Sequence, residues 1–176
     1  MNKVLLYFIT INSMLLVTLC DNRDNECIPR INEFDSNVKV ISLNPFQETY
    51  NQGDEITLKI EIPSNNSHFG EPLNLYDING DTATLDATDI LFEDNTLRFI
   101  KGNRNETNSF LFDVPYNTIT DMYELEIVIT LNRIGEYVQY NEGYIGFGGE
   151  NLCPNYSLTS LIIDQDSSLI EFTVTE

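Results

Sequence analysis

The chain is poor in the residues that most often carry catalysis or nucleic-acid binding. It has no tryptophan, one histidine and three cysteines, and its Lys and Arg residues number 9 against 28 Asp and Glu, a formal net charge of −19. Such a surface repels nucleic acid and anionic lipid headgroups, so we expect neither as a partner. The single histidine, His68, leaves no Ser–His or Cys–His pair that the sequence can place. We therefore expect no enzyme activity and no cofactor.

Carboxylates are abundant, and this abundance keeps a second class of function open. A carbohydrate-active enzyme that uses two carboxylates is the competing hypothesis, although nothing distinguishes one pair from a solvated acidic face. The absence of tryptophan also removes a common stacking platform for sugars. A structural subunit of an envelope complex is a further alternative. Since 41% of the residues are hydrophobic, the chain is long and apolar enough for a folded core.

The N-terminus has the layout of a secretory signal, with Lys3 followed by an apolar run from Val4 to Leu19. The run is shorter and more polar than the roughly 20 apolar residues that a membrane-spanning helix needs. We predict a signal peptide over residues 1–19. Ordinary cleavage near Cys20 without lipid, and retention of the uncleaved segment, are the alternatives.

Two short motifs follow this run. Val17-Thr18-Leu19-Cys20 resembles a bacterial lipobox, with Leu19 in the place where the family has Gly, Ala or Ser. The acidic segment from Asp21 to Glu26 resembles the surface-export signal of lipoproteins of the Bacteroidota. The resemblance implies a lipid on Cys20, a tether over residues 20–36, and anchoring at the outer membrane or cell surface. We expect a β-sandwich domain over residues 37–176, from the periodicity described below. A lipid-anchored binding or scaffolding module is the leading interpretation, with a protein or a glycan as its ligand.

Cysteine parity agrees with a lipid on Cys20, because Cys27 and Cys153 then remain to pair with each other. Export would place both in an oxidising compartment, so we predict a disulfide between them. A metal site is the alternative, but two cysteines and His68 are a poor ligand set for zinc, and we expect no metal.

Alternation of apolar and polar residues predicts the fold class. Glu55–Ile62, Tyr123–Leu131 and Ser168–Val174 alternate with a period of two, which is typical of half-buried strands. Asn79-Gly80 predicts a hairpin between strands at Leu73–Ile78 and Thr82–Leu85. Many short strands broken by turns predict an all-β antiparallel β-sandwich. Other expected strands are Val38–Leu43, Thr96–Ile100, Ser109–Val114, Leu158–Asp164, and a pair formed by Glu136–Tyr140 and Gly143–Phe147.

Thr120-Asp121-Met122-Tyr123-Glu124-Leu125 resembles the tyrosine corner of immunoglobulin-like domains, with one residue fewer than the usual spacing. This resemblance implies a sandwich of the immunoglobulin-like type.

Three further segments offer candidate sites. Asp81-Thr82-Ala83 resembles the O-glycosylation signal of exported Bacteroidota proteins, which implies Thr82 as the acceptor. Asp77–Asp81 resembles the start of a calcium loop, but Thr82 and Thr88 stand where that loop needs Gly and a carboxylate, so a turn is favoured. Aromatic residues surround the glycine-rich segment at 143–149 and form either a binding patch or core packing. They are Tyr137, Tyr140, Tyr144, Phe147 and Tyr156.

Overall fold

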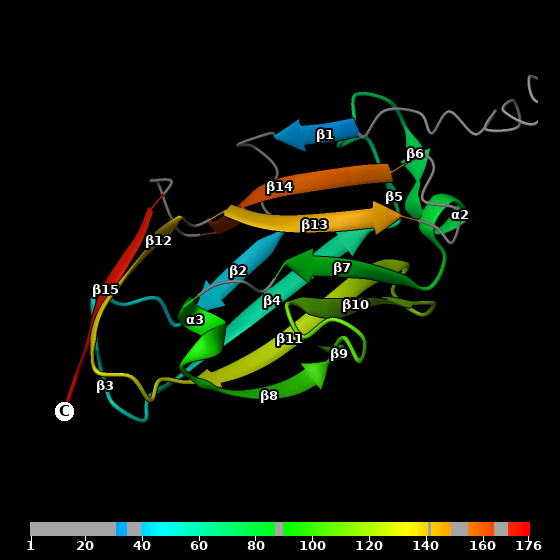
Figure 1. The fold of residues 1–176 in the computed structure, drawn as a ribbon. Coiled ribbons are helices and arrows are strands. Elements are labelled where there is room, and N and C mark those ends of the chain that lie inside the picture. Colours follow the sequence, from blue (N-terminus) through cyan, green and yellow to red (C-terminus); the bar gives the residue numbers. More distant parts are fainter. Residues whose placement is uncertain (1–30, 35–39, 87–89, 141, 149–154, 164–168) are drawn as a thin grey trace, which may run out of the picture.

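The computed structural model describes residues 31–34, 40–86, 90–140, 142–148, 155–163 and 169–176 (Figure 1). Within these ranges the chain consists mostly of antiparallel strands, with two short helices, α2 (Leu75–Asn79) and α3 (Ile90–Glu93). The predicted all-β class is confirmed. No helix in the described ranges is long and apolar enough to cross a membrane.

The largest sheet is curled, and pairing between two of its strands closes it into a ring. Its order is β8 (Thr96–Lys101), β11 (Met122–Thr130), β4 (Glu55–Pro63), β2 (Ile41–Asn44), β14 (Asn155–Ile163), β13 (Glu142–Gly148), β7 (Thr82–Asp86), β10 (Leu111–Asn117) and β9 (Asn103–Arg104). The end of β10 also pairs with the start of β11, through Tyr116 opposite Tyr123 and Asn117 opposite Met122. The strands from β11 round to β10 therefore form a ring (Figure 1). Apolar side chains from these strands form one hydrophobic core.

Strands β4 and β11 show why the alternation was a reliable signal. Ile56, Leu58, Ile60 and Ile62 are buried, and the inward residues of β11 are buried as well. The strands pair along their whole lengths, with Ile60 opposite Leu125. An apolar residue at every second position places one continuous apolar face in the core, as the sequence predicts.

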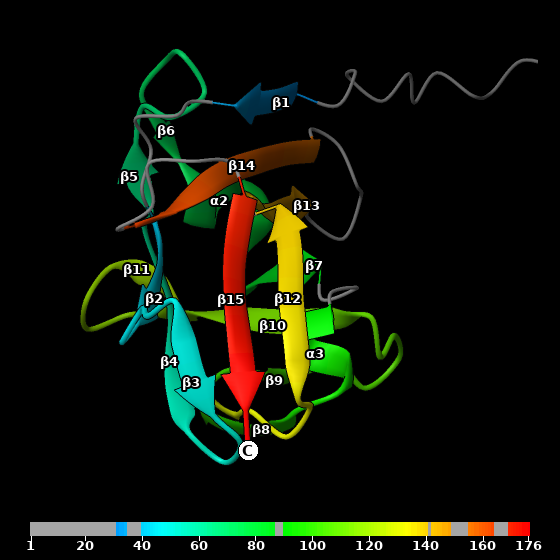
Figure 2. The same cartoon turned by 90° about the vertical axis from the view of Figure 1, so that its left-hand side faces the viewer.

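A second sheet covers one end of the ring in the order β12 (Gly135–Tyr140), β15 (Leu169–Thr175) and β3 (Thr49–Asn51) (Figure 2). The expected pairing of 136–140 with 143–147 is wrong, because β12 pairs with β15 and β13 pairs with β14 and β7. Stacking of Tyr137 on Phe172, with ring centroids 4.7 Å apart, accompanies the long-range pairing. Proximity in sequence is therefore a poor guide to pairing here.

The expected hairpin at Asn79-Gly80 is also wrong. A two-stranded sheet of β5 (Asn65–Asn66) and β6 (Leu73–Asn74) leads directly into α2. The side chain of Asn74 accepts hydrogen bonds from the backbone N–H groups of Tyr76 and Asp77, which caps the N-terminus of the helix. Gly80 ends the helix with φ of 73° and donates its N–H to the carbonyl of Tyr76. Capping residues at both ends thus favour one helical turn over the predicted strand.

Strand β1 (Ile31–Phe34) belongs to the segment predicted as tether. It pairs in parallel with β14, with Ile31 opposite Tyr156 and Phe34 opposite Thr159. The folded domain therefore begins before residue 37. Parallel pairs also join β14 to β2 and β15 to β3, so the fold is not purely antiparallel.

Candidate functional site

The structure separates the aromatic residues that the sequence grouped around the glycine-rich segment. Tyr137, Phe147 and Tyr156 are buried in the core, where Phe147 meets Tyr123 edge to face at 5.4 Å between ring centroids. These three residues are core packing and do not form a surface patch. The backbones of Tyr140 and Tyr144 lie in β12 and β13, and their side chains lie outside the described part of the structure.

Of the other predicted site residues, the structure describes Thr82 but not the three cysteines. Cys20, Cys27 and Cys153 lie outside the described residues, so the lipid and the disulfide stay predictions. Thr82 is exposed at the start of β7, where it lies opposite Pro115. Across the described ranges, no group of three or more His, Cys, Asp or Glu side chains has an arrangement that could hold a metal ion.

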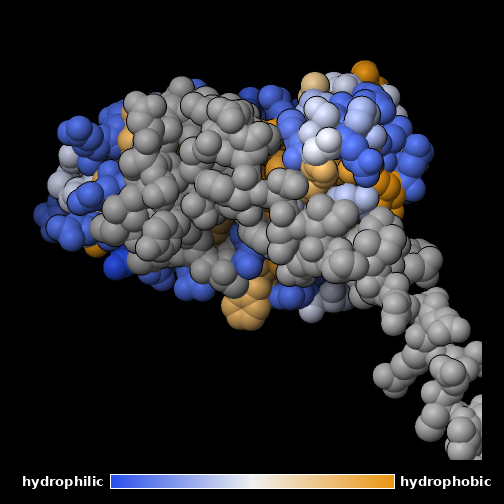
Figure 3. All heavy atoms as spheres, turned by 90° about the horizontal axis from the view of Figure 1, so that it is seen from above, coloured by the Kyte–Doolittle hydropathy of each residue, from blue (hydrophilic) through white to orange (hydrophobic). Residues whose placement is uncertain are grey.

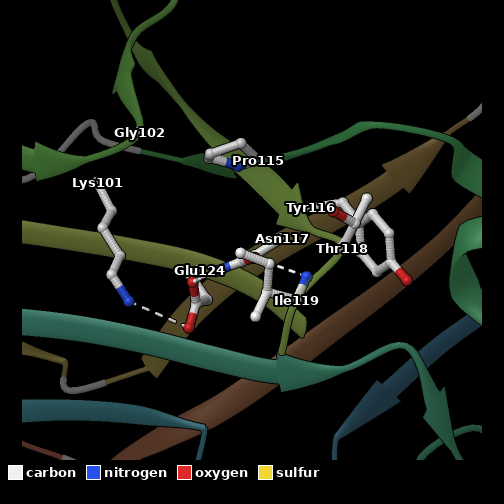
Figure 4. Close-up of a pocket in the computed structure, with 8 residues that line it drawn as sticks. All are labelled: Lys101, Gly102, Pro115, Tyr116, Asn117, Thr118, Ile119 and Glu124. Carbon is white, nitrogen blue, oxygen red and sulfur yellow. Dashed lines mark hydrogen bonds and ion pairs between the residues drawn. The ribbon is translucent and has the colours of Figure 1, made fainter. Parts of the chain in front are cut away.

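A pocket that the sequence did not predict lies where β11 changes partner from β8 to β10 (Figure 4). Its volume is about 350 Å³. We call it the Glu124 pocket. Its lining residues are Lys101, Gly102, Pro115, Tyr116, Asn117, Thr118, Ile119 and Glu124.

Glu124 is a buried carboxylate, with 5% of its surface exposed. Lys101 Nζ lies 3.1 Å from Oε1, and Asn117 Nδ2 donates to Oε2 at 2.7 Å (Figure 4). Burial alone would raise the pKa of Glu124, but the hydrogen bonds from Asn117 and Lys101 and the lysine charge outweigh it and lower the pKa. Glu124 is therefore held as a carboxylate at neutral pH.

A β-bulge and a glycine place Lys101 over this carboxylate. The register between β8 and β11 skips Ile100, because Phe99 lies opposite Ile127 and Lys101 lies opposite Glu126. An extra residue of this kind bends the strand and redirects the side chain that follows it. Gly102 then adopts φ of +79°, in a space where a Cβ atom would approach the carbonyl oxygen of Asp113 to 2.5 Å.

A second hollow, which we call the asparagine groove, lies beside β5 and β6 and has a volume of about 500 Å³. Its walls are uncharged: Asn65, Asn66, Ser67, Pro72, Leu73 and Asn74. The amides are fixed by internal bonds. Asn74 Oδ1 accepts from the hydroxyl of the buried Ser64 at 2.9 Å, in addition to capping α2. Asn66 Nδ2 donates to the carbonyl of Pro63 at 2.7 Å. These bonds hold the groove in a defined shape.

Asp121 joins the two hollows. Its Oδ1 accepts from the hydroxyl of Tyr116 at 2.7 Å, and its Oδ2 accepts from Asn65 Nδ2 at 3.0 Å. Its backbone carbonyl accepts from the N–H of Ser64 at 2.9 Å. The hydrogen bond to this carboxylate raises the pKa of Tyr116 to about 12. The turn between β10 and β11 is thereby attached to the corner after β4.

Comparisons with known proteins give no family. No family model matches the chain, and no curated protein matches it. A solved structure with some likeness is the reeler domain of human F-spondin, at 10% sequence identity and a TM-score of 0.41, covering 89% of this chain and 100% of the reeler chain. A TM-score this low defines neither the type of β fold nor a function.

Proposed function

We propose that the chain is a non-enzymatic binding or scaffolding module that a lipid on Cys20 anchors at the outer membrane or cell surface. The proposal includes a β-sandwich of the immunoglobulin-like type as its scaffold. The anchor is supported by the apolar run that ends at Cys20 and by the odd number of cysteines.

The observation that carries the binding role is the connected surface formed by the Glu124 pocket, Asp121 and the asparagine groove. Concave surfaces with fixed polar groups are the usual form of recognition sites. The protein holds these groups in place before any ligand arrives, which lowers the entropic cost of binding. A protein or glycan ligand would meet a carboxylate, an ammonium group and several amides here.

The carboxylate-enzyme alternative finds no support in this pocket. A general acid needs a raised pKa so that it carries a proton at neutral pH, whereas the pKa of Glu124 is lowered. Glu124 is moreover engaged by Lys101 and Asn117. We therefore propose that the ion pair between Lys101 and Glu124 fixes the shape of the Glu124 pocket.

Two lysines provide a matched test of the pocket. Lys101 is paired with Glu124 inside it, and Lys59 is paired with Glu126 on the neighbouring strand at 3.5 Å, outside its lining. Their side chains are equally exposed, at 43% and 45%. We expect Lys101→Ala, but not Lys59→Ala, to weaken capture of the ligand from the protein's own membranes. Equal capture by both variants would place the binding surface elsewhere.

The anchor is tested separately by Cys20→Ala. The parent is expected to fractionate with membranes and to carry a lipid mass on Cys20, and the variant to lose both. A variant that stays in the membrane fraction, together with a parent free of lipid, would refute the anchor.

A further inference from the structure

Glu124 differs from the other charged side chains that the structure describes, because it is buried. On the face shown in Figure 3 the described residues are mostly hydrophilic, and the surface is the usual place for charge. Only 5% of Glu124 is exposed, and among the described residues no other charged side chain is buried. Burying a carboxylate costs free energy unless partners satisfy it, so the chemistry of this site depends on those partners.

The two partners that bind the oxygens of Glu124 are an amine and a primary amide. Lys101 Nζ lies 3.1 Å from Oε1, and Asn117 Nδ2 lies 2.7 Å from Oε2 (Figure 4). Lys101 is the last residue of β8 and Asn117 is the last residue of β10. One carboxylate therefore contacts a nitrogen nucleophile on one side and the nitrogen of an amide group on the other.

The carbonyl of the same amide also has a fixed donor. Asn117 Oδ1 accepts a hydrogen bond from the backbone N–H of Ile119 at 2.9 Å. A donor at this oxygen stabilises the negative charge that develops when a nucleophile adds to the carbonyl carbon. The amide of Asn117 is thus polarised at its oxygen and has a proton carrier at its nitrogen.

We propose that Lys101 and Asn117 become joined by a covalent isopeptide bond, with Glu124 as the proton carrier. Glu124 takes a proton from the Lys101 ammonium, and the neutral amine adds through Nζ to Cγ of Asn117. Glu124 then transfers protons from Nζ to Nδ2, the bond between Cγ and Nδ2 breaks, and the nitrogen leaves as ammonium. One ammonium group and one primary amide give one secondary amide and one ammonium ion, so no oxidant or reductant is needed.

The geometry favours this step in three ways. Both reacting groups are held against one carboxylate, which makes their reaction unimolecular. The Lys101 side chain is 43% exposed on a flexible stem, so Nζ can turn from Oε1 toward Cγ. The Glu124 pocket, with a volume of about 350 Å³, gives the released ammonium a path to water. The described structure is the state before the bond forms.

Mass spectrometry of the purified full-length chain tests the bond directly. On incubation at neutral pH, the parent is expected to lose the mass of one ammonia molecule. Trypsin does not cut after an acylated lysine, so residues 99–104 should remain joined to residues 105–133. Lys101→Arg and Glu124→Gln should keep the full mass. Lys59→Arg, a change outside the pocket lining, should react like the parent.

Lys101→Arg keeps a cation opposite Glu124, so loss of the fold does not explain its failure to react. A succinimide at Asn79-Gly80 would also release ammonia, but it forms without Lys101 and leaves the two tryptic peptides separate. A parent that keeps its full mass, separate peptides, or a loss of ammonia that persists in Lys101→Arg would each overturn the proposal. The bond goes beyond the proposed binding function, and either can fail alone.

Discussion

Replacing Gly102 by alanine tests how the Glu124 pocket is built. Gly102 has φ of +79°, and a Cβ atom there would lie 2.5 Å from the carbonyl oxygen of Asp113 and 2.5 Å from Cδ1 of Leu125. The left-handed conformation costs an L side chain about 1–2 kcal/mol. The added methyl group also forces a shift of packed atoms, and the backbone oxygen cannot rotate away as a side chain can. Such overpacking costs a further 1–3 kcal/mol or so, giving about 2–5 kcal/mol in total.

Gly70→Ala is the matched control. Gly70 has φ of +85°, but a Cβ atom there would have no neighbour within 4 Å. We expect this variant to lose only the conformational part, about 1–2 kcal/mol. Urea unfolding followed by circular dichroism gives both free energies, and an unchanged slope confirms that the unfolded state is comparable. Equal losses in the two variants would refute the close contact at Gly102 and with it the described position of Lys101.

Three further predictions concern the cysteines, the hydrogen bond between Tyr116 and Asp121, and the buried carboxylate of Glu124. Thiol counting on the exported, denatured chain is expected to find Cys27 and Cys153 oxidised, and two free thiols before reduction would contradict the disulfide. Asp121→Asn should lower the pKa of Tyr116 from about 12 toward its ordinary value of 10.0, measured by ultraviolet absorbance, and an unchanged pKa would exclude the hydrogen bond as its cause. Because the pKa of Glu124 is lowered by folding, its stabilisation exists above its unfolded pKa and is lost as pH falls through the folded value. Glu124→Gln should therefore lose less stability than the parent as the pH falls below 4.5, the ordinary pKa of a glutamate, and parallel curves would refute this assignment.

The strands that sequence analysis located well are those with a strict period over a long run. In β4 and β11 the apolar residues alternate over nine residues each, and this pattern is independent of which strands become neighbours. Strand pairing is different, because it depends on contacts between distant segments. The stacking of Tyr137 on Phe172 could not be foreseen from either local pattern. Asn74 and Gly80 did carry a capping signal, but Asn79-Gly80 was interpreted as a hairpin turn instead.

The candidate site was hidden for a related reason. Glu124 occupies an outward position of an alternating strand, where the sequence gives it the same pattern as Glu126. Glu126 remains partly exposed, with 22% of its side chain accessible, whereas 7% of the Glu124 side chain is accessible. The difference comes from Lys101 and Asn117, which the bulge in β8 and the pairing of β10 bring over Glu124. Neither feature is visible in the alternation.

The location of the pocket follows from the closure of the ring. Strand β11 pairs with β8 from Glu126 onward and with β10 at Met122 and Tyr123, so neither pairing includes Glu124 on that side. At such a change of partner two strand ends diverge, and side chains must fill the space between them. Lys101 comes from one strand end and Asn117 from the other, and each binds a different oxygen of Glu124. The same carboxylate therefore joins the two strand ends and lines the pocket, so a variant of Glu124 is expected to affect stability and ligand binding together.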